Sequence, residues 1–194
     1  MNGASNRLIR INSDGDSTTY PLNLPGNWRT GDVDSQGHLW VALFDGTWAE
    51  IDVDQQSPTF GTVLSQGDGT GFRADYTVAD WAFVPGGGPY TYAIIYQTDG
   101  DARRARFNTL TGTWDPLESY GQLVNGSSGC WGAVYSSGGG NLYASENNTG
   151  EIWRFPIVNG GDPEMVVQGP VSSNNDGARC VLAPDPAAPS STAT

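Results

Sequence analysis

The sequence predicts an all-β fold, a four-bladed β-propeller, and three observations lead to this prediction. The 194 residues contain 27 Gly, 12 Pro and 7 Trp, a composition typical of short strands joined by tight turns. A half-apolar segment that ends in a glycine turn recurs about every fifty residues, at 30–37, 80–87 and 131–138. No long stretch shows the 3.6-residue periodicity of a helix.

Each repeat continues into three further predicted strands. Aromatic-centred second strands follow the glycine turns at 39–41, 91–93 and 142–144. Third strands are predicted at 8–12, 48–52, 104–108 and 152–156, and fourth strands at 18–22, 58–64, 113–117 and 164–168. The third strands carry a charged residue in register, namely Arg10, Glu50, Arg106 and Arg154. This register favours repeated blades over a β-sandwich, whose turn signals are similar.

The ends of the chain predict one blade shared between the termini. The chain starts in the turn before a third strand and ends with a first strand at 177–183, so this blade lacks a second strand. Such closure covers sheet edges that would otherwise invite association. Truncation of a longer reading frame explains the missing strand best, and membership of a larger ring is the alternative. We expect the propeller domain at 1–184 and a Pro/Ala/Ser/Thr-rich linker or stalk at 185–194.

The charge balance bears on the partners. Nine Arg, with no Lys, face 21 Asp and Glu, for a formal net charge of −12. A nucleic-acid partner is disfavoured, because phosphate binding requires a basic face. No apolar run approaches the roughly 20 residues of a membrane-spanning helix, so no membrane insertion is expected. Residues 1–6 show no signal peptide, which we expect to lie upstream.

An extracellular or cell-wall location is expected from the Ser/Thr/Pro-rich end and from two N-glycosylation sequons. These sequons begin at Asn125 and Asn147.

Two segments carry a resemblance to a known family. They are residues 31–41, Gly-Asp-Val-Asp-Ser-Gln-Gly-His-Leu-Trp-Val, and residues 175–180, Asn-Asp-Gly-Ala-Arg-Cys. Together they resemble an uncharacterised β-propeller domain of secreted and cell-wall proteins, mostly fungal, which is distantly similar to quinoprotein-like propellers. The resemblance covers about residues 7–183. It implies the fold and supplies no catalytic residues.

Propeller geometry predicts where a ligand binds. The loops that lead into the innermost strands, and the turns between second and third strands, open on one face around the central channel. Aromatic rings beside carboxylate and amide groups are typical of sugar binding. The predicted ligand-binding residues on this face are Trp28, Arg29, Arg73, Asp75, Tyr76, Asp80, Trp131, Asn175 and Asp176. Packing between blades is the alternative role for Trp131.

No catalytic residues are predicted, although a carboxylate pair among Asp75, Asp80 and Asp176 is an alternative. His38 is the single histidine and begins a strand. No metal or other cofactor is expected, although 14–16 and 99–101, each Asp-Gly-Asp, leave calcium open. Cys130 and Cys180 each stand near the start of an inner strand, where a disulfide and two buried thiols are both compatible with the sequence.

The function that the sequence favours is a non-catalytic carbohydrate-binding or adhesion-like module. The first alternative is a protein–protein interaction scaffold, with a protein ligand at the same channel mouth. The second alternative is a carboxylate-dependent hydrolase or lyase.

Overall fold

The computed structural model describes residues 6–95, 101–125 and 129–178, and these residues form strands joined by turns. A short hairpin comes first, with β1 (Arg7–Ile11) and β2 (Ser17–Pro21). The first four-stranded sheet contains β3 (Thr30–Val33), β4 (His38–Ala42), β5 (Trp48–Asp52) and β6 (Val63–Gly67). Among the described residues, no helix has the length and apolar character that a membrane crossing requires.

Two more four-stranded sheets follow in the same antiparallel order. The second sheet contains β7 (Ala82–Phe83), β8 (Tyr90–Ile95), β9 (Arg103–Asn108) and β10 (Thr113–Ser119). The third sheet contains β11 (Trp131–Ser136), β12 (Asn141–Glu146), β13 (Glu151–Pro156) and β14 (Glu164–Gln168). In each sheet every strand pairs with the next one along the chain. The three sheets are therefore blades of the kind that the repeat predicts.

The charged residues of the third strands occupy equivalent positions, as the sequence predicts. Each side chain bonds to a polar group on a neighbouring segment: Glu50 to Ser65 at 2.6 Å, Arg106 to Asp115 at 2.7 Å, Arg154 to Glu164 at 2.7 Å and Arg10 to Gln55 at 3.0 Å. In the three complete blades the partner lies opposite on the outermost strand. These cross-strand pairs fix the register of the outer strands.

One predicted strand is misplaced. The sequence predicts a fourth strand at 58–64, whereas the structure forms turns up to residue 62 and begins β6 at Val63. The carboxylate of Asp52 accepts hydrogen bonds from the hydroxyls of Ser57 at 2.5 Å and Thr59 at 2.6 Å. These hydroxyl groups hold the segment in a turn, since side-chain bonds of this kind compete with strand formation.

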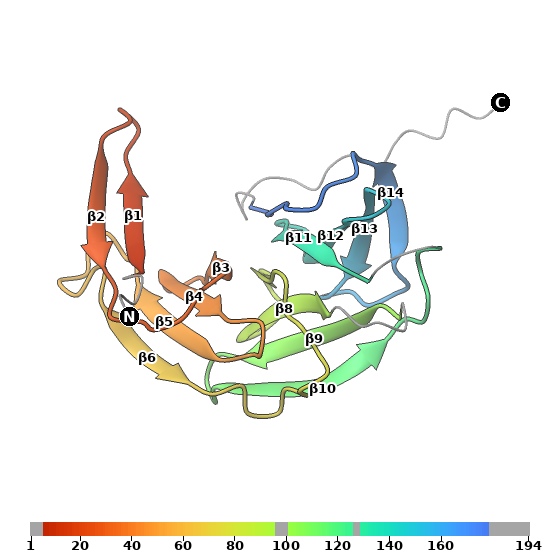
Figure 1. Ribbon diagram of the computed structural model, residues 1–194, viewed down its shortest axis with the longest axis horizontal. Coiled ribbons are helices and arrows are strands. Elements are labelled where there is room, and N and C mark those ends of the chain that lie inside the picture. Colours follow the sequence, from red (N-terminus) through yellow and green to blue (C-terminus); the bar gives the residue numbers. More distant parts are fainter. Residues whose placement is uncertain (1–5, 96–100, 126–128, 179–194) are drawn as a thin grey trace.

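The sheets follow one another along an arc, with β3, β8 and β11 on its inner side and β6 and β10 on its outer side (Figure 1). The hairpin β1–β2 and the sheet β11–β14 lie at the two ends of this arc. The predicted closing strand at 177–183 falls largely outside the described residues, as does the predicted linker at 185–194. The count of four blades and the closure of the ring stay predictions.

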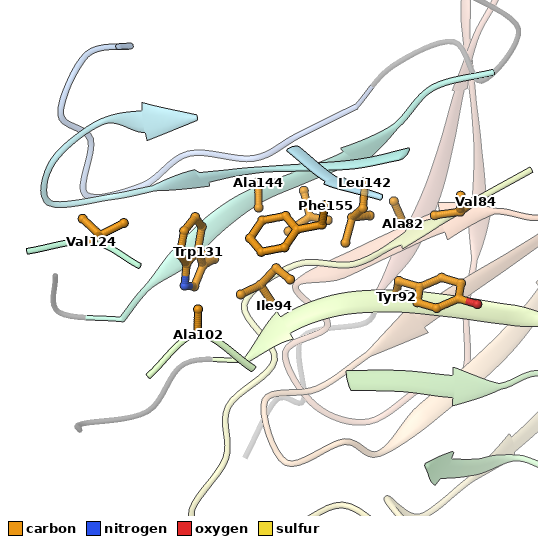
Figure 2. Packing of buried hydrophobic residues seen from close by; sticks show 11 residues of the cluster. Ala82, Val84, Tyr92, Ile94, Ala102, Val124, Trp131, Leu142, Ala144 and Phe155 are labelled. Atoms are coloured by element: carbon orange, nitrogen blue, oxygen red, sulfur yellow. The ribbon is translucent and has the colours of Figure 1, made fainter. Parts of the chain in front are cut away.

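Apolar side chains fill the spaces between neighbouring blades. Figure 2 shows the cluster between the second and third sheets, in which Trp131, Ile94 and Phe155 lie together. A second cluster between the first and second sheets contains Trp81 and Trp40. The indole Nε1 of Trp81 donates a hydrogen bond to the backbone oxygen of Trp40, 3.2 Å away. Packing of this kind is the main attraction that holds the blades in place.

Buried polar groups join the innermost strands directly. The carboxylate of Asp32 on β3 accepts a 2.7 Å hydrogen bond from the backbone N–H of Phe83 on β7. The hydroxyl of Ser136 on β11 donates to the backbone oxygen of the same Phe83 at 2.6 Å. Burial raises the pKa of Asp32, partly offset by its hydrogen bonds. Each link satisfies a backbone group that the short inner strands leave unpaired.

Candidate functional site

A cleft of about 330 Å³ opens where the innermost strands begin. It is lined by Arg29, Phe44, Ala79, Cys130, Gly132, Asn147, Ser173, Asn174, Asn175 and Asp176. Three of these residues stand just before β3, β7 or β11, two follow β4 or β12, and four belong to the segment after β14. The loops that the sequence places on one face therefore meet at this site, which we call the mouth cleft.

An aromatic ring and a cation form one side of the mouth cleft. Phe44 lies in the turn between β4 and β5, and its side chain is 43% exposed. The guanidinium carbon of Arg29 lies 4.8 Å from the centre of this ring. Such stacking fixes the orientation of both groups. Among the described residues, no carboxylate forms an ion pair with Arg29, which lines the cleft.

Amide side chains form the opposite side. Asn147 is 7% exposed; its Oδ1 accepts from the backbone N–H of Gly132 at 3.2 Å, and its Nδ2 donates to Cys130 Sγ at 3.3 Å. The amide of Asn175 lies so close to Gly132 that a Cβ there would be 2.2 Å from Asn175 Oδ1. This Oδ1 is buried and has no donor among the described residues. A glycine at 132 is therefore required for the amides to reach the cleft floor.

A buried carboxylate supports the mouth cleft from below. Asp80 is 1% exposed and accepts four hydrogen bonds: from Thr30 Oγ1 at 3.0 Å, Trp81 N at 2.9 Å, Val134 N at 2.6 Å and Gly177 N at 3.3 Å. These donors belong to the three inner strands or their immediate starts and to the segment after β14. Asp80 thus joins the four parts of the chain that surround the cleft.

The pKa of Asp80 is raised to about 7, mainly by burial and in smaller part by the negative charge of Asp176, and the hydrogen bonds to the carboxylate offset part of this rise. Burial also raises the pKa of the Cys130 thiol, with a smaller contribution from Glu146, so this thiol is protonated at neutral pH. Burial is therefore the main cause of the raised pKa values of Asp80 and Cys130. The carboxylate that is exposed at the cleft is that of Asp176.

The structure brings together only part of the predicted mouth. Arg29, Asn175 and Asp176 line the mouth cleft. Asp80 and Trp131 are each 1% exposed, so neither side chain lies on the surface. Trp131 packs edge-to-face on Phe155 with ring centres 5.7 Å apart, which is the alternative that the sequence left open.

The other predicted residues lie at separate places. Arg73 and Tyr76 line a cleft of about 280 Å³ over β10, where Arg73 donates two hydrogen bonds to Asp75, at 3.0 and 2.8 Å. Of the three carboxylates of the alternative site, Asp75 therefore lies apart with Arg73, whereas Asp176 is near enough to buried Asp80 to affect its pKa. Trp28 lines a further cleft, described below.

Sequence reasoning missed two groups at the mouth cleft. Phe44 was placed on the correct face by its position between second and third strands, but a lone Phe in a turn carries no signal of exposure. Asn147 was interpreted as a glycan acceptor. Its amide is instead buried and hydrogen-bonded, so a glycan on Nδ2 would have to displace the contact with Cys130. Asn125 is exposed.

The disulfide and calcium alternatives gain little from the structure. Cys130 forms no disulfide with any described residue, and Cys180 lies outside the described residues, so their pairing stays a prediction. The turn at 14–16 is fixed by Asn12, whose Oδ1 accepts from the N–H groups of Asp14 at 3.1 Å and Asp16 at 2.8 Å. The second Asp-Gly-Asp turn lies mostly outside the described ranges.

A family model described as a repeat of unknown function, DUF6923, matches residues 1–182. The chain belongs to this family. The match covers the repeats, the mouth cleft and the described strands, and it assigns no function to them. A comparison with curated proteins gave no match.

Solved structures show which fold this family member adopts. The chain is similar to the Dos1 propeller, with 14% identity and a TM-score of 0.52 over 78% of this chain and 39% of that one. It is similar to the β-propeller domain of Cps50 (Swd1) from Myceliophteria thermophila, with 15% identity and a TM-score of 0.50 over 90% and 55%. It is also similar to a streptogramin B lyase, with 17% identity and a TM-score of 0.52 over 84% and 48%.

These similarities confirm the predicted β-propeller architecture. The chain spans about half of the length of the solved chains that it matches. At these identities the likeness concerns the fold alone, because one propeller scaffold supports many unrelated functions.

Proposed function

We propose that this domain is a non-catalytic carbohydrate-binding module whose ligand enters the mouth cleft. One observation carries the proposal: the exposed ring of Phe44 and the guanidinium of Arg29 stand beside the cleft that Asn174, Asn175 and Asp176 also line. A sugar ring presents an apolar face and a rim of hydroxyl groups. The Phe44 ring suits that face, while amide and carboxylate oxygens suit the hydroxyl groups.

The expected strength of one such site is low. An aromatic contact contributes about 0.5–1.5 kcal/mol beyond area burial, and a net hydrogen bond contributes about 0.5–1.5 kcal/mol. A single exposed ring with a few polar partners therefore suits millimolar rather than nanomolar binding. Display of many copies on one surface would raise the overall avidity without any new contact. Weak binding at each site with high overall avidity fits an adhesion-like role. Such a role requires an extracellular or cell-wall location, which we also propose.

The titratable groups support a role without chemistry. A general acid or base must reach the substrate, and its pKa must lie near the operating pH. The pKa of Asp80 is about 7, but its carboxylate is 1% exposed and holds four protein donors. Asp176 is exposed at the cleft and contacts a ligand in our proposal as a hydrogen-bond acceptor.

A glycan array at high protein density, followed by calorimetry on each hit, tests the proposal. Replacing Phe44 with Ala is expected to weaken binding about tenfold, the upper end of one aromatic contact. Leu110→Ala is the matched control, because Leu110 is 76% exposed in the turn between β9 and β10. Both variants should keep the melting temperature of the native protein.

An array without hits at high density contradicts the proposal. Capture of a defined protein partner that free sugars do not displace favours the interaction-scaffold alternative instead. A hit whose affinity is unaffected by Phe44→Ala places the sugar site elsewhere and contradicts the assignment to the mouth cleft.

A further inference from the structure

A second cleft, of about 360 Å³, lies directly beside the mouth cleft. It is lined by Pro25, Trp28, Leu43, Thr47, Trp48, Gln66, Gly67 and Asp68. Two Trp residues and a Pro thus line the same opening as three polar residues. We call it the indole cleft.

The two clefts share a wall. Trp28 lines the indole cleft, and the next residue, Arg29, lines the mouth cleft. Likewise, Leu43 lines the indole cleft and Phe44 lines the mouth cleft. The turn that carries Leu43 and Phe44 is closed by a 2.8 Å hydrogen bond from Leu43 N to Thr47 O and a 3.1 Å bond from Gly46 N to Leu43 O. A ridge made by this turn and the Trp28–Arg29 step therefore separates two neighbouring openings.

The rings of the indole cleft are held in place before any ligand arrives. Trp28 Nε1 donates to the backbone oxygen of Pro25 at 3.0 Å. Trp48 packs against Trp40 and Phe107, with ring centres 5.7 and 5.2 Å apart. A Cβ on Gly112 would lie 2.5 Å from the Trp48 ring, so a glycine is needed there for the indole to lie flat on the backbone. Rings fixed in this way lose little entropy on binding.

We infer that the indole cleft is a second subsite for the same ligand, so that the domain binds an extended carbohydrate chain rather than a single terminal sugar. This inference rests on the proposed function. Each cleft alone is near the lower end of the roughly 300–1,000 Å³ typical of ligand pockets, whereas the two together suit a chain of several units. In this arrangement one sugar unit stacks on an indole ring in the indole cleft. The next unit forms hydrogen bonds with the amide groups in the mouth cleft.

The charge of the protein selects among such chains. Asp68 lines the indole cleft and Asp176 lines the mouth cleft, in a chain with a formal net charge of −12. A polyanionic polysaccharide would be repelled by this field, with Arg29 as the local exception. The ligand class that the two clefts fit is therefore a neutral polysaccharide.

Calorimetry with neutral oligosaccharides of increasing length tests the inference. The probes are gluco-oligosaccharides and N-acetylglucosamine oligomers of one to six units. We expect the affinity to rise about tenfold or more between the shortest and longest member of the binding series, because a second aromatic subsite becomes filled. Trp28→Ala should reduce hexamer affinity to that of the short members, whereas Phe44→Ala should weaken every length.

A double surface variant guards against loss of the fold, since Trp28 packs partly against the apolar cluster that contains Leu22 and Leu24. Asp68 and Gln66 are exposed in the indole cleft, and replacing both with Ala should reproduce the length-dependent loss. Equal affinity for monomer and hexamer overturns the inference while leaving the proposed function intact. A loss that is the same at every length in the Asp68/Gln66 variant overturns it as well. Absence of binding by all probes overturns the inference, and the glycan array then decides the proposed function separately.

Discussion

The carboxylate of Asp80 accepts a 2.6 Å hydrogen bond from the backbone N–H of Val134, which joins the start of the second blade to the innermost strand of the third. The same carboxylate accepts bonds from Thr30, Trp81 and Gly177. One side chain therefore holds together segments that are up to 97 residues from it in the chain. The mouth cleft depends on this carboxylate without presenting it to a ligand.

Replacing Asp80 with Ala should destabilise the protein strongly. The backbone N–H groups of Trp81 and Val134 and the Thr30 hydroxyl would lose a buried acceptor, and each unsatisfied group costs about 1–3 kcal/mol before relaxation, whereas the Gly177 N–H keeps the carboxylate of Asp176. We expect the free energy of unfolding to fall by about 3–5 kcal/mol in urea denaturation. Asp162→Ala, at an exposed position, is the matched control and should change it by less than about 0.5 kcal/mol. An Asp80→Ala loss as small as the control's would show that these bonds carry little energy.

The stability of the protein should depend on pH through Asp80. Its pKa is about 7 in the folded protein, against 3.8 for an unperturbed group. Between these values the folded state holds a proton that the unfolded chain has released. The free energy of unfolding therefore falls as the pH rises from about 4 to about 7, by at most about 1.4 kcal/mol per pH unit. Asp80→Asn should remove this part of the slope. Equal slopes for both proteins would show that Asp80 is ionised throughout.

Trp131 should contribute to stability and not to ligand contact. It is 1% exposed and packs between the second and third sheets (Figure 2). Trp131→Ala is expected to cost about 3–5 kcal/mol of unfolding free energy, the typical cost of truncating a buried aromatic residue. Thermal and chemical denaturation measure this loss, with Leu110→Ala as the exposed control. If the Trp131→Ala protein were as stable as the native protein but bound sugar less tightly, this prediction would be contradicted and Trp131 would be a ligand-binding residue.

The two sequons should behave differently. When the protein is secreted from a eukaryotic host, we expect a glycan on exposed Asn125 and none on Asn147, whose amide is buried against Cys130. Intact mass before and after glycosidase treatment measures the occupancy. Asn125→Gln should abolish the mass shift, and Asn147→Gln should leave it unchanged. A shift that survives Asn125→Gln would mean that Asn147 leaves its buried position before or after folding.

Much of the architecture follows from local pattern. The recurring glycine turn, the aromatic second strand and the charged third-strand residue correctly predict three complete blades and the β1–β2 hairpin. They do so because strand alternation and turn chemistry are short-range properties. The strand predicted at 58–64 is wrong, because Ser57 and Thr59 donate hydrogen bonds to Asp52 on the preceding strand and so form a turn.

The sequence by itself determined the blade repeat and the face on which the connecting loops meet, and so it placed Arg29, Asn175 and Asp176 at the mouth. The tertiary structure alone decided that Trp131 and Asp80 are interior, and that Phe44 is exposed. A Trp or an Asp before an inner strand has the same local pattern whether it faces the channel or the next blade. Only the neighbouring blade, brought there by long-range packing, supplies the apolar surface and the N–H donors that bury it.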